Sequence, residues 1–143
     1  MVKRILVPTD GTAASRAAVD AAISFAHDSR AEVVGLHVTP PRPILTEGMG
    51  TAAVPESEDA ARECLGYVER RAAQAQVPAE LIMRRADAPS EAILAAAREY
   101  RCDLIVMGAH AKGAGHFLPP GSQTTAVLRH GTLPVLVVPA PAK

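Results

Sequence analysis

Short aliphatic runs alternate with segments of helical periodicity along the whole chain, and this alternation is the strongest constraint on its fold. The runs that suit strands are residues 5–7, 33–38, 81–83, 104–107 and 136–138. The first and fourth consist entirely of Ile, Leu, Val and Met, which is typical of strands buried on both faces. Five such strands with helices between them predict an α/β fold, an open five-stranded parallel sheet with helices on both faces.

Four helices are expected in the intervals between these runs. Their predicted limits are residue 12 to at least 25, 55 to about 76, 89 to 100, and 122 to 131. Pro55 and Pro89 suit the first turn of a helix, where the missing N–H is no loss. Ser122 suits an N-cap and Gly131 suits a C-terminal stop. The segment 39–54 is long for a connection in a compact domain, which predicts a flap or a disordered link.

Composition limits the classes of protein that the chain can belong to. A length of 143 residues with 48% hydrophobic content suits one domain spanning residues 1–143. Lys plus Arg and Asp plus Glu number 15 each, and this zero net charge argues against a nucleic-acid partner. No apolar run is long enough to cross a bilayer, and Met1 to Arg4 lead straight into a strand rather than a secretory leader. We therefore expect a cytoplasmic protein with no membrane partner.

Metal-binding and catalytic patterns are weak in this sequence. Cys64 and Cys102 do not form a CxxC pair and are expected to be reduced and structural. His37 and His110 have no cysteine or carboxylate at ligand spacing, so no metal site is expected. A nucleophile elbow and a Ser/His/Asp pattern are also missing, and we assign no catalytic residue. A binding protein is the better expectation than an enzyme.

Ligands of open parallel sheets bind beyond the carboxyl ends of the strands, where the strand order reverses. Three polar or glycine-bearing stretches follow predicted strands, namely residues 8–12, 37–39 and 108–122. The third stretch contains four glycines and leads to Ser122, at the start of a predicted helix. Backbone N–H groups and the helix dipole favour an anion at such a place.

The stretch 108–122 matches neither of the standard phosphate motifs. Ala114 and Gly115 stand where a P-loop has Lys and Ser or Thr, and Leu118 stands where a dinucleotide fingerprint has its last glycine. The residues alone therefore leave two interpretations open with equal weight. One is a phosphate-binding loop, and the other is an ordinary glycine-bearing surface loop.

Several segments in the right order resemble the universal stress protein family over nearly the whole chain. The matching segments are ILVPTDG at 5–11, LHV at 36–38, ADAPSEAI at 86–93, DLIVMGAH at 103–110, GS at 121–122, VLRH at 127–130 and PVLVV at 134–138. The resemblance implies a Rossmann-like fold of the adenine nucleotide α-hydrolase-like type. It also implies a homodimer that pairs through the last strand, Val135–Val138, where an apolar edge favours association.

ATP-binding members of this family are similar to this chain in the loop after the fourth strand, where they show G-x-x-G-x9-G-[S/T]. Gly108 matches the first glycine, and Gly121 and Ser122 match the final pair. Ala111 replaces the second glycine, and Gln123 follows where a small apolar residue is usual. Pro119 and Pro120 replace aliphatic residues and remove two backbone donors. The resemblance thus implies ATP as ligand, with Mg²⁺ if it is bound.

The resemblance also implies roles for most of the site residues. Asp10, within the turn that contains Pro8 and Thr9, would meet the ribose or adenosine portion, and the Val38 backbone would meet the adenine edge. Gly108, Gly121, Ser122 and the Gln123 amide would surround the phosphates, and Lys112, in the same loop, could add positive charge. Met107 and Ala111 complete the set of residues expected at the site.

Three functions remain open on the sequence. The favoured one is an adenine-nucleotide-binding regulatory module of the stress response, because most of the loop spacing is intact. The alternative is a dimeric interaction module that binds no nucleotide, which Ala111 and the two prolines favour. A slow ATPase ranks last, since no residue resembles a positioned base or a pair of metal carboxylates.

Overall fold

The nine predicted elements are present in the structure, a computed structural model that describes residues 1–39, 54–109 and 123–141. The strands are β1 (Arg4–Pro8), β2 (Glu32–Thr39), β3 (Ala79–Arg85), β4 (Leu104–Gly108) and β5 (Val135–Val138). The helices are α1 (Ala13–Ser29), α2 (Val54–Ala75), α3 (Pro89–Glu99) and α4 (Gln123–His130). Most of the segment 39–54, predicted as a flap or a link, lies outside the described residues.

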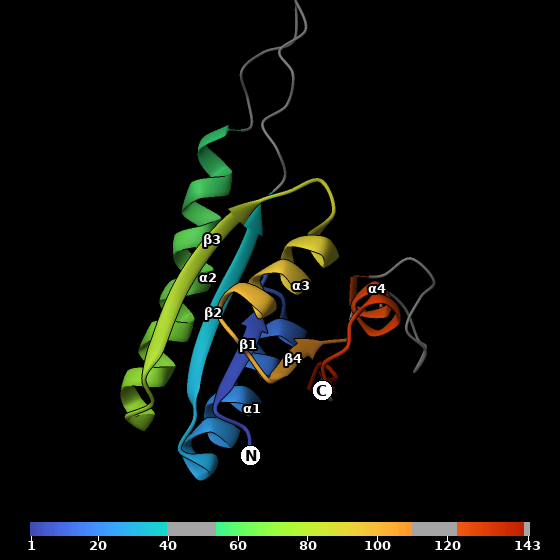
Figure 1. The fold of residues 1–143 in the computed structure, drawn as a ribbon. Helices are drawn as coiled ribbons and strands as arrows, with labels where there is room; N and C mark the ends of the chain where they lie inside the picture. The colour runs from blue at the N-terminus through green and yellow to red at the C-terminus, as the bar shows by residue number, and fades with distance from the viewer. Residues whose placement is uncertain (40–53, 110–122, 142–143) are drawn as a thin grey trace, which may run out of the picture.

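The five strands form one parallel sheet in the order β3-β2-β1-β4-β5. The chain first moves from β1 outward through β2 to β3, and then returns to place β4 on the other side of β1 (Figure 1). In the register, Ile5 of β1 lies between Val33 of β2 and Leu104 of β4. The strand order therefore reverses between β1 and β4. The predicted open five-stranded parallel sheet is confirmed.

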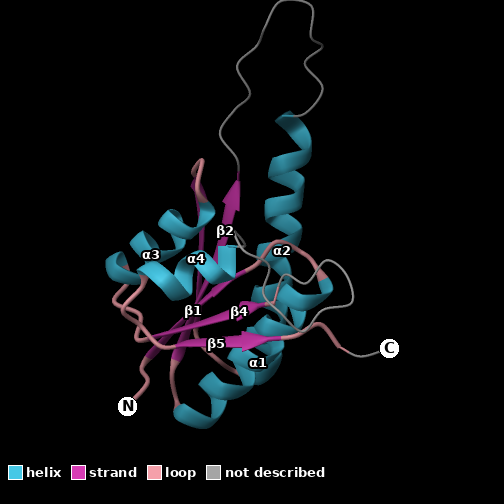
Figure 2. Ribbon diagram, turned by 90° about the vertical axis from the view of Figure 1, so that its right-hand side faces the viewer, coloured by secondary structure: helices cyan, strands magenta, loops and turns pink. Residues whose placement is uncertain are grey.

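Alternate residues of the strands face two separate apolar cores. Ile5 and Val7 pack with α1 and α2, whereas Leu6, between them, packs with α3 and α4. Figure 2 shows these two helix layers on opposite sides of the sheet. The near-continuous apolar runs in β1 and β4 follow from this arrangement, because both faces of each strand are buried.

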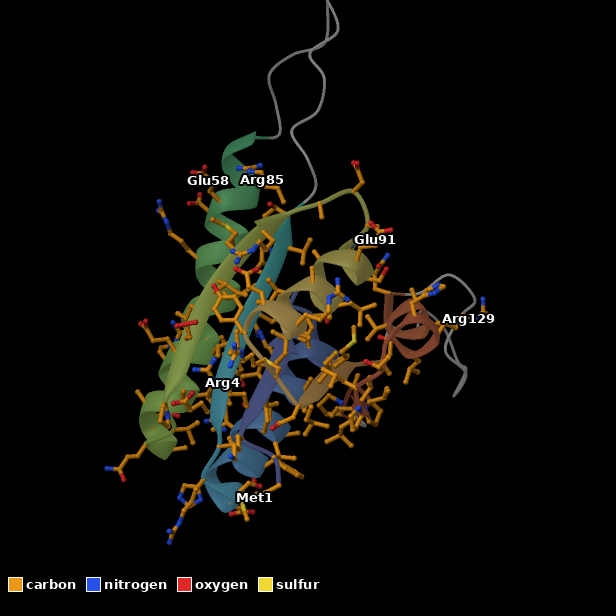
Figure 3. The ribbon with its side chains drawn as sticks, in the orientation of Figure 1. Met1, Arg4, Glu58, Arg85, Glu91 and Arg129 are labelled. Atoms are coloured by element: carbon orange, nitrogen blue, oxygen red, sulfur yellow. The ribbon has the colours of Figure 1, made fainter. Side chains whose placement is uncertain are left out.

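The edges of the sheet differ in character. The edge strand β3 carries charged residues, and Arg85 at its end lies 3.9 Å from the carboxylate of Glu58 on α2 (Figure 3). The opposite edge, β5, consists of Val and Leu alone, and Leu136 is 41% exposed. The prediction that the third strand lies near an edge is confirmed, although β3 is longer than the apolar run 81–83 that predicted it.

The helix boundaries follow from local chemistry. The Thr12 side chain accepts the Ser15 N–H and caps α1, and proline occupies the first position of α3. Arg30 and Arg101 follow the last turns of α1 and α3 in the left-handed region, with φ of 57° and 54°. The helix α4 ends one residue before Gly131, as predicted.

Candidate functional site

A cavity of about 270 Å³ lies at the carboxyl ends of β1, β2 and β4, beside the reversal of strand order. Its lining comes from three strand ends and from the first turns of α1, α3 and α4. The lining residues are Pro8, Thr9, Asp10, Thr12, Ala14, Ser15, Leu36, Val38, Pro89, Ile93, Met107, Gly108, Gln123 and Thr124. This is the place where open parallel sheets bind their ligands.

The turn after β1 is held in one conformation by hydrogen bonds around Asp10. Its Oδ1 accepts the Thr12 backbone N–H at 3.0 Å and the Thr12 hydroxyl at 2.7 Å. Gly11, between them, has a φ of 83°, a conformation that glycine adopts without strain. The Asp10 carboxylate is thereby fixed at the rim of the cavity while it remains exposed.

The start of this turn is anchored to β2. The Thr9 N–H donates to the Leu36 carbonyl at 2.8 Å, and the buried His37 donates from Nδ1 to the Thr9 carbonyl at 2.9 Å. Because a carbonyl only accepts, Nδ1 of His37 must carry the proton. His37 therefore holds the backbone of the site.

Gly108 ends β4 where α1 approaches it closely. A Cβ at this position would lie 2.6 Å from the Ala14 carbonyl carbon and 2.8 Å from the Ser15 nitrogen. The Gly108 carbonyl accepts the hydroxyl of Thr124, on α4, at 3.0 Å. Close packing of α1 thus accounts for glycine here, in addition to the role in phosphate binding that the sequence suggests.

The start of α4 is connected to the start of α3. The Gln123 Oε1 accepts the Ser90 backbone N–H at 2.8 Å. Ala88, the N-cap residue of α3, has no side-chain hydrogen-bonding group, and no side-chain cap comes from it. The first turns of two helices are therefore joined directly across one wall of the cavity.

The lining of the cavity combines apolar side chains with polar groups. Leu36, Val38, Ile93 and Met107 supply an aliphatic wall of the kind that receives a flat aromatic ring. Four hydroxyl groups, the Gln123 amide and the Asp10 carboxylate also line the cavity, and the first turns of α1, α3 and α4 bring the positive ends of three helix dipoles to it. Such an arrangement suits a ligand with an apolar ring and an anionic or strongly polar part.

The two thiols of the described chain do not suit nucleophilic chemistry. Burial, followed by the charges of Asp10 and Glu63, raises the pKa of Cys64, and burial raises the pKa of Cys102 to about 11. Both cysteines are buried and unpaired with one another, as predicted for reduced structural residues. A thiol with a raised pKa is a poor nucleophile near neutral pH.

Seven of the predicted site residues lie together on the cavity wall. They are Pro8, Thr9, Asp10, Val38, Met107, Gly108 and Gln123. The other four, Ala111, Lys112, Gly121 and Ser122, lie outside the described residues. The other lining residues, which the sequence did not assign to the site, are Thr12, Ala14, Ser15, Leu36, Pro89, Ile93 and Thr124. Leu36 and Ile93 look like core in the sequence, whereas the position of Thr12 and Ser15 after a strand end was an available signal.

The described residues show neither a metal cluster nor a membrane segment. Within the ranges that the structure describes, no group of three or more His, Cys, Asp or Glu side chains could hold a metal ion. None of the helices in those same ranges has the length and apolar character required to span a bilayer.

Comparisons with known proteins agree with the geometry. A universal stress protein of Thermus aquaticus is 38% identical over 96% of this chain and 99% of its own length. The crystal structure of a universal stress protein family member from Burkholderia pseudomallei has a TM-score of 0.79 and 29% identity, with 97% of both chains covered. A universal stress protein crystallised in complex with cAMP has a TM-score of 0.76 and 27% identity, covering 98% of this chain and 99% of its own. The sequence profile of the universal stress protein family matches residues 1–139, and the chain belongs to that family.

Proposed function

We propose that this chain binds ATP or another adenine nucleotide in the cavity beside β1 and β4, as a regulatory module of the stress response. The observation that carries the proposal is the convergence of an aliphatic wall and three helix N-termini on one cavity at the reversal of strand order. The aliphatic wall fits the adenine ring, and the helix dipoles favour the phosphates. The cAMP complex of a relative supports the same ligand class.

Each part of the nucleotide has candidate partners among the described residues. The backbone of Val38 would meet the adenine edge, and the Asp10 carboxylate would accept from the ribose hydroxyls. Gly108 and the backbone N–H of Gln123 would lie near the phosphates. Asp10 is the one carboxylate among the described lining residues. A Mg²⁺ ion that takes one carboxylate together with phosphate oxygens would fit that donor set.

Titration calorimetry with ATP, ADP and AMP tests this proposal. We expect saturable binding in the micromolar range for at least one of them. The Asp10→Asn variant keeps an acceptor oxygen for Thr12 but loses the negative charge that strengthens a ribose contact. We expect it to bind about 10-fold more weakly.

Asp59→Asn is the matched control for the charge change. Asp59 is exposed on α2, where its carboxylate lies 4.0 Å from Arg62. We expect this variant to bind nucleotide like the wild type. No saturable heat at millimolar nucleotide would contradict the proposal and leave the interaction module as the function.

We further propose a cytoplasmic homodimer that pairs along β5. Two properties of β5 support this choice of edge, its Val and Leu composition and the exposure of Leu136. Leu136→Lys should convert a dimer to a monomer in sedimentation equilibrium. Met83→Lys provides the matched control, because Met83 is 46% exposed on the opposite edge strand. A monomeric wild type, or dissociation by Met83→Lys instead, would contradict pairing through β5.

A further inference from the structure

The side chain of Gln123 replaces a missing cap. The first N–H groups of a helix need an acceptor from outside the helix, usually the side chain of the N-cap residue. In α3 that residue is Ala88, which offers none. The acceptor for Ser90 is instead the Gln123 side chain, 33 residues away in the sequence and 2.8 Å away in space.

This hydrogen bond fixes the orientation of the Gln123 amide. A backbone N–H can only donate, so the atom that faces Ser90 is Oε1. The other end of the amide, Nε2, carries two N–H groups and can only donate. Gln123 also lines the cavity, at the first residue of α4. A neutral donor is thus tethered beside the converging N-termini of α3 and α4.

We propose that the Gln123 side chain favours ligands that carry a phosphate group. In this proposal Oε1 is anchored on Ser90 and Nε2 donates a hydrogen bond to a phosphate oxygen. This inference rests on the proposed nucleotide binding and adds a residue that determines specificity within that site. An anchored amide loses less rotamer freedom on binding than a free one. The contact exists for AMP and not for adenosine, which has no phosphate.

Two substitutions separate the anchor from the donor. Gln123→Glu keeps an acceptor for Ser90 but replaces the donor with a negative charge, which repels phosphate. Gln123→Ala removes both groups. Gln74→Glu is the matched control, because Gln74 lies on α2 and its Oε1 accepts from Arg71, a contact that a carboxylate preserves.

Calorimetric affinities for AMP and adenosine give the decisive ratio. We expect Gln123→Glu to weaken the binding of AMP about 10- to 100-fold and the binding of adenosine less than about 2-fold. We expect a Tm unchanged for Gln123→Glu and lowered by roughly 2–6 °C for Gln123→Ala, because only Ala removes the cap. Gln74→Glu should leave both affinities unchanged.

Equal AMP affinity in the wild type and Gln123→Glu would overturn the inference. An equal loss of affinity for AMP and for adenosine in Gln123→Glu would also overturn it. A wild type that binds neither ligand would overturn the proposed function and the phosphate contact together. Hydrogen exchange at the Ser90 amide then still reports on the anchor. It should be faster in Gln123→Ala than in Gln123→Glu, and equal rates would contradict the cap itself.

Discussion

Gly108 lies against the backbone of Ala14 so closely that a Cβ on Gly108 would stand 2.6 Å from the Ala14 carbonyl carbon. Because the obstacle is backbone, no side chain can move aside to accommodate it. Gly108→Ala should therefore destabilise the fold by about 1–3 kcal/mol, as measured by urea unfolding. It should also weaken nucleotide binding, since the displaced residues line the cavity.

Gly66→Ala is the control for this substitution. A Cβ on Gly66, within α2, would meet only the end of the Arg70 side chain, which can move. Ala in place of Gly inside a helix stabilises by about 0.5–1 kcal/mol. The two glycine substitutions should thus have opposite signs, and a neutral Gly108→Ala would show that α1 does not depend on this contact.

A left-handed residue ends α1 without the glycine that this conformation favours. Arg30 has a φ of 57°, and its N–H donates to the carbonyls of Ala26 and His27. Arg30→Gly should raise the free energy of unfolding by about 1 kcal/mol, because glycine has no Cβ to strain there. Arg70→Gly, at an exposed position inside α2, should lower it by about 1 kcal/mol. Thermal unfolding of the two variants checks that the free energy of unfolding rises in Arg30→Gly and falls in Arg70→Gly.

The hydroxyl of Thr124 supports the end of β4. Thr124 is fully buried, and its Oγ1 donates to the Gly108 carbonyl at 3.0 Å. Thr124→Val keeps the shape and removes the donor, which should cost about 1–2 kcal/mol in urea unfolding. Thr124→Ser keeps the donor and loses only a methyl group. If the Thr124→Val variant proves as stable as the wild type, the Thr124 hydroxyl does not stabilise the end of β4.

The raised pKa of the Cys102 thiol predicts that the protein loses stability at alkaline pH. Burial raises the pKa of this thiol from its ordinary value of 9.0 to about 11 in the folded protein. The fold favours the neutral thiol, so this stabilisation is complete below pH 9 and is lost as the pH rises through about 11. The free-energy difference between the wild type and Cys102→Ala should therefore fall across this window. A constant difference would contradict the raised pKa.

The strands were predictable because most of them are continuous aliphatic runs with turn residues at their ends. The length of β3 was underestimated, because four of its seven residues are charged or small and lie at the edge of the sheet. These residues are Ala79, Glu80, Arg84 and Arg85. The bond between Gln123 and Ser90 was not predictable, because only tertiary packing brings the starts of α3 and α4 together. Gly108 looked like a phosphate contact in the sequence, whereas the approach of α1 to Gly108 exists only in the folded chain.

Amide chemical shifts of the ¹⁵N-labelled protein, followed during titration with AMP, test the location of the binding site most directly. We predict that the largest changes cluster at Thr9, Val38, Ser90 and Gly108, around the cavity at the carboxyl ends of β1, β2 and β4. Changes that instead cluster along the β3 edge near Met83, or no saturable change at millimolar AMP, would contradict the account.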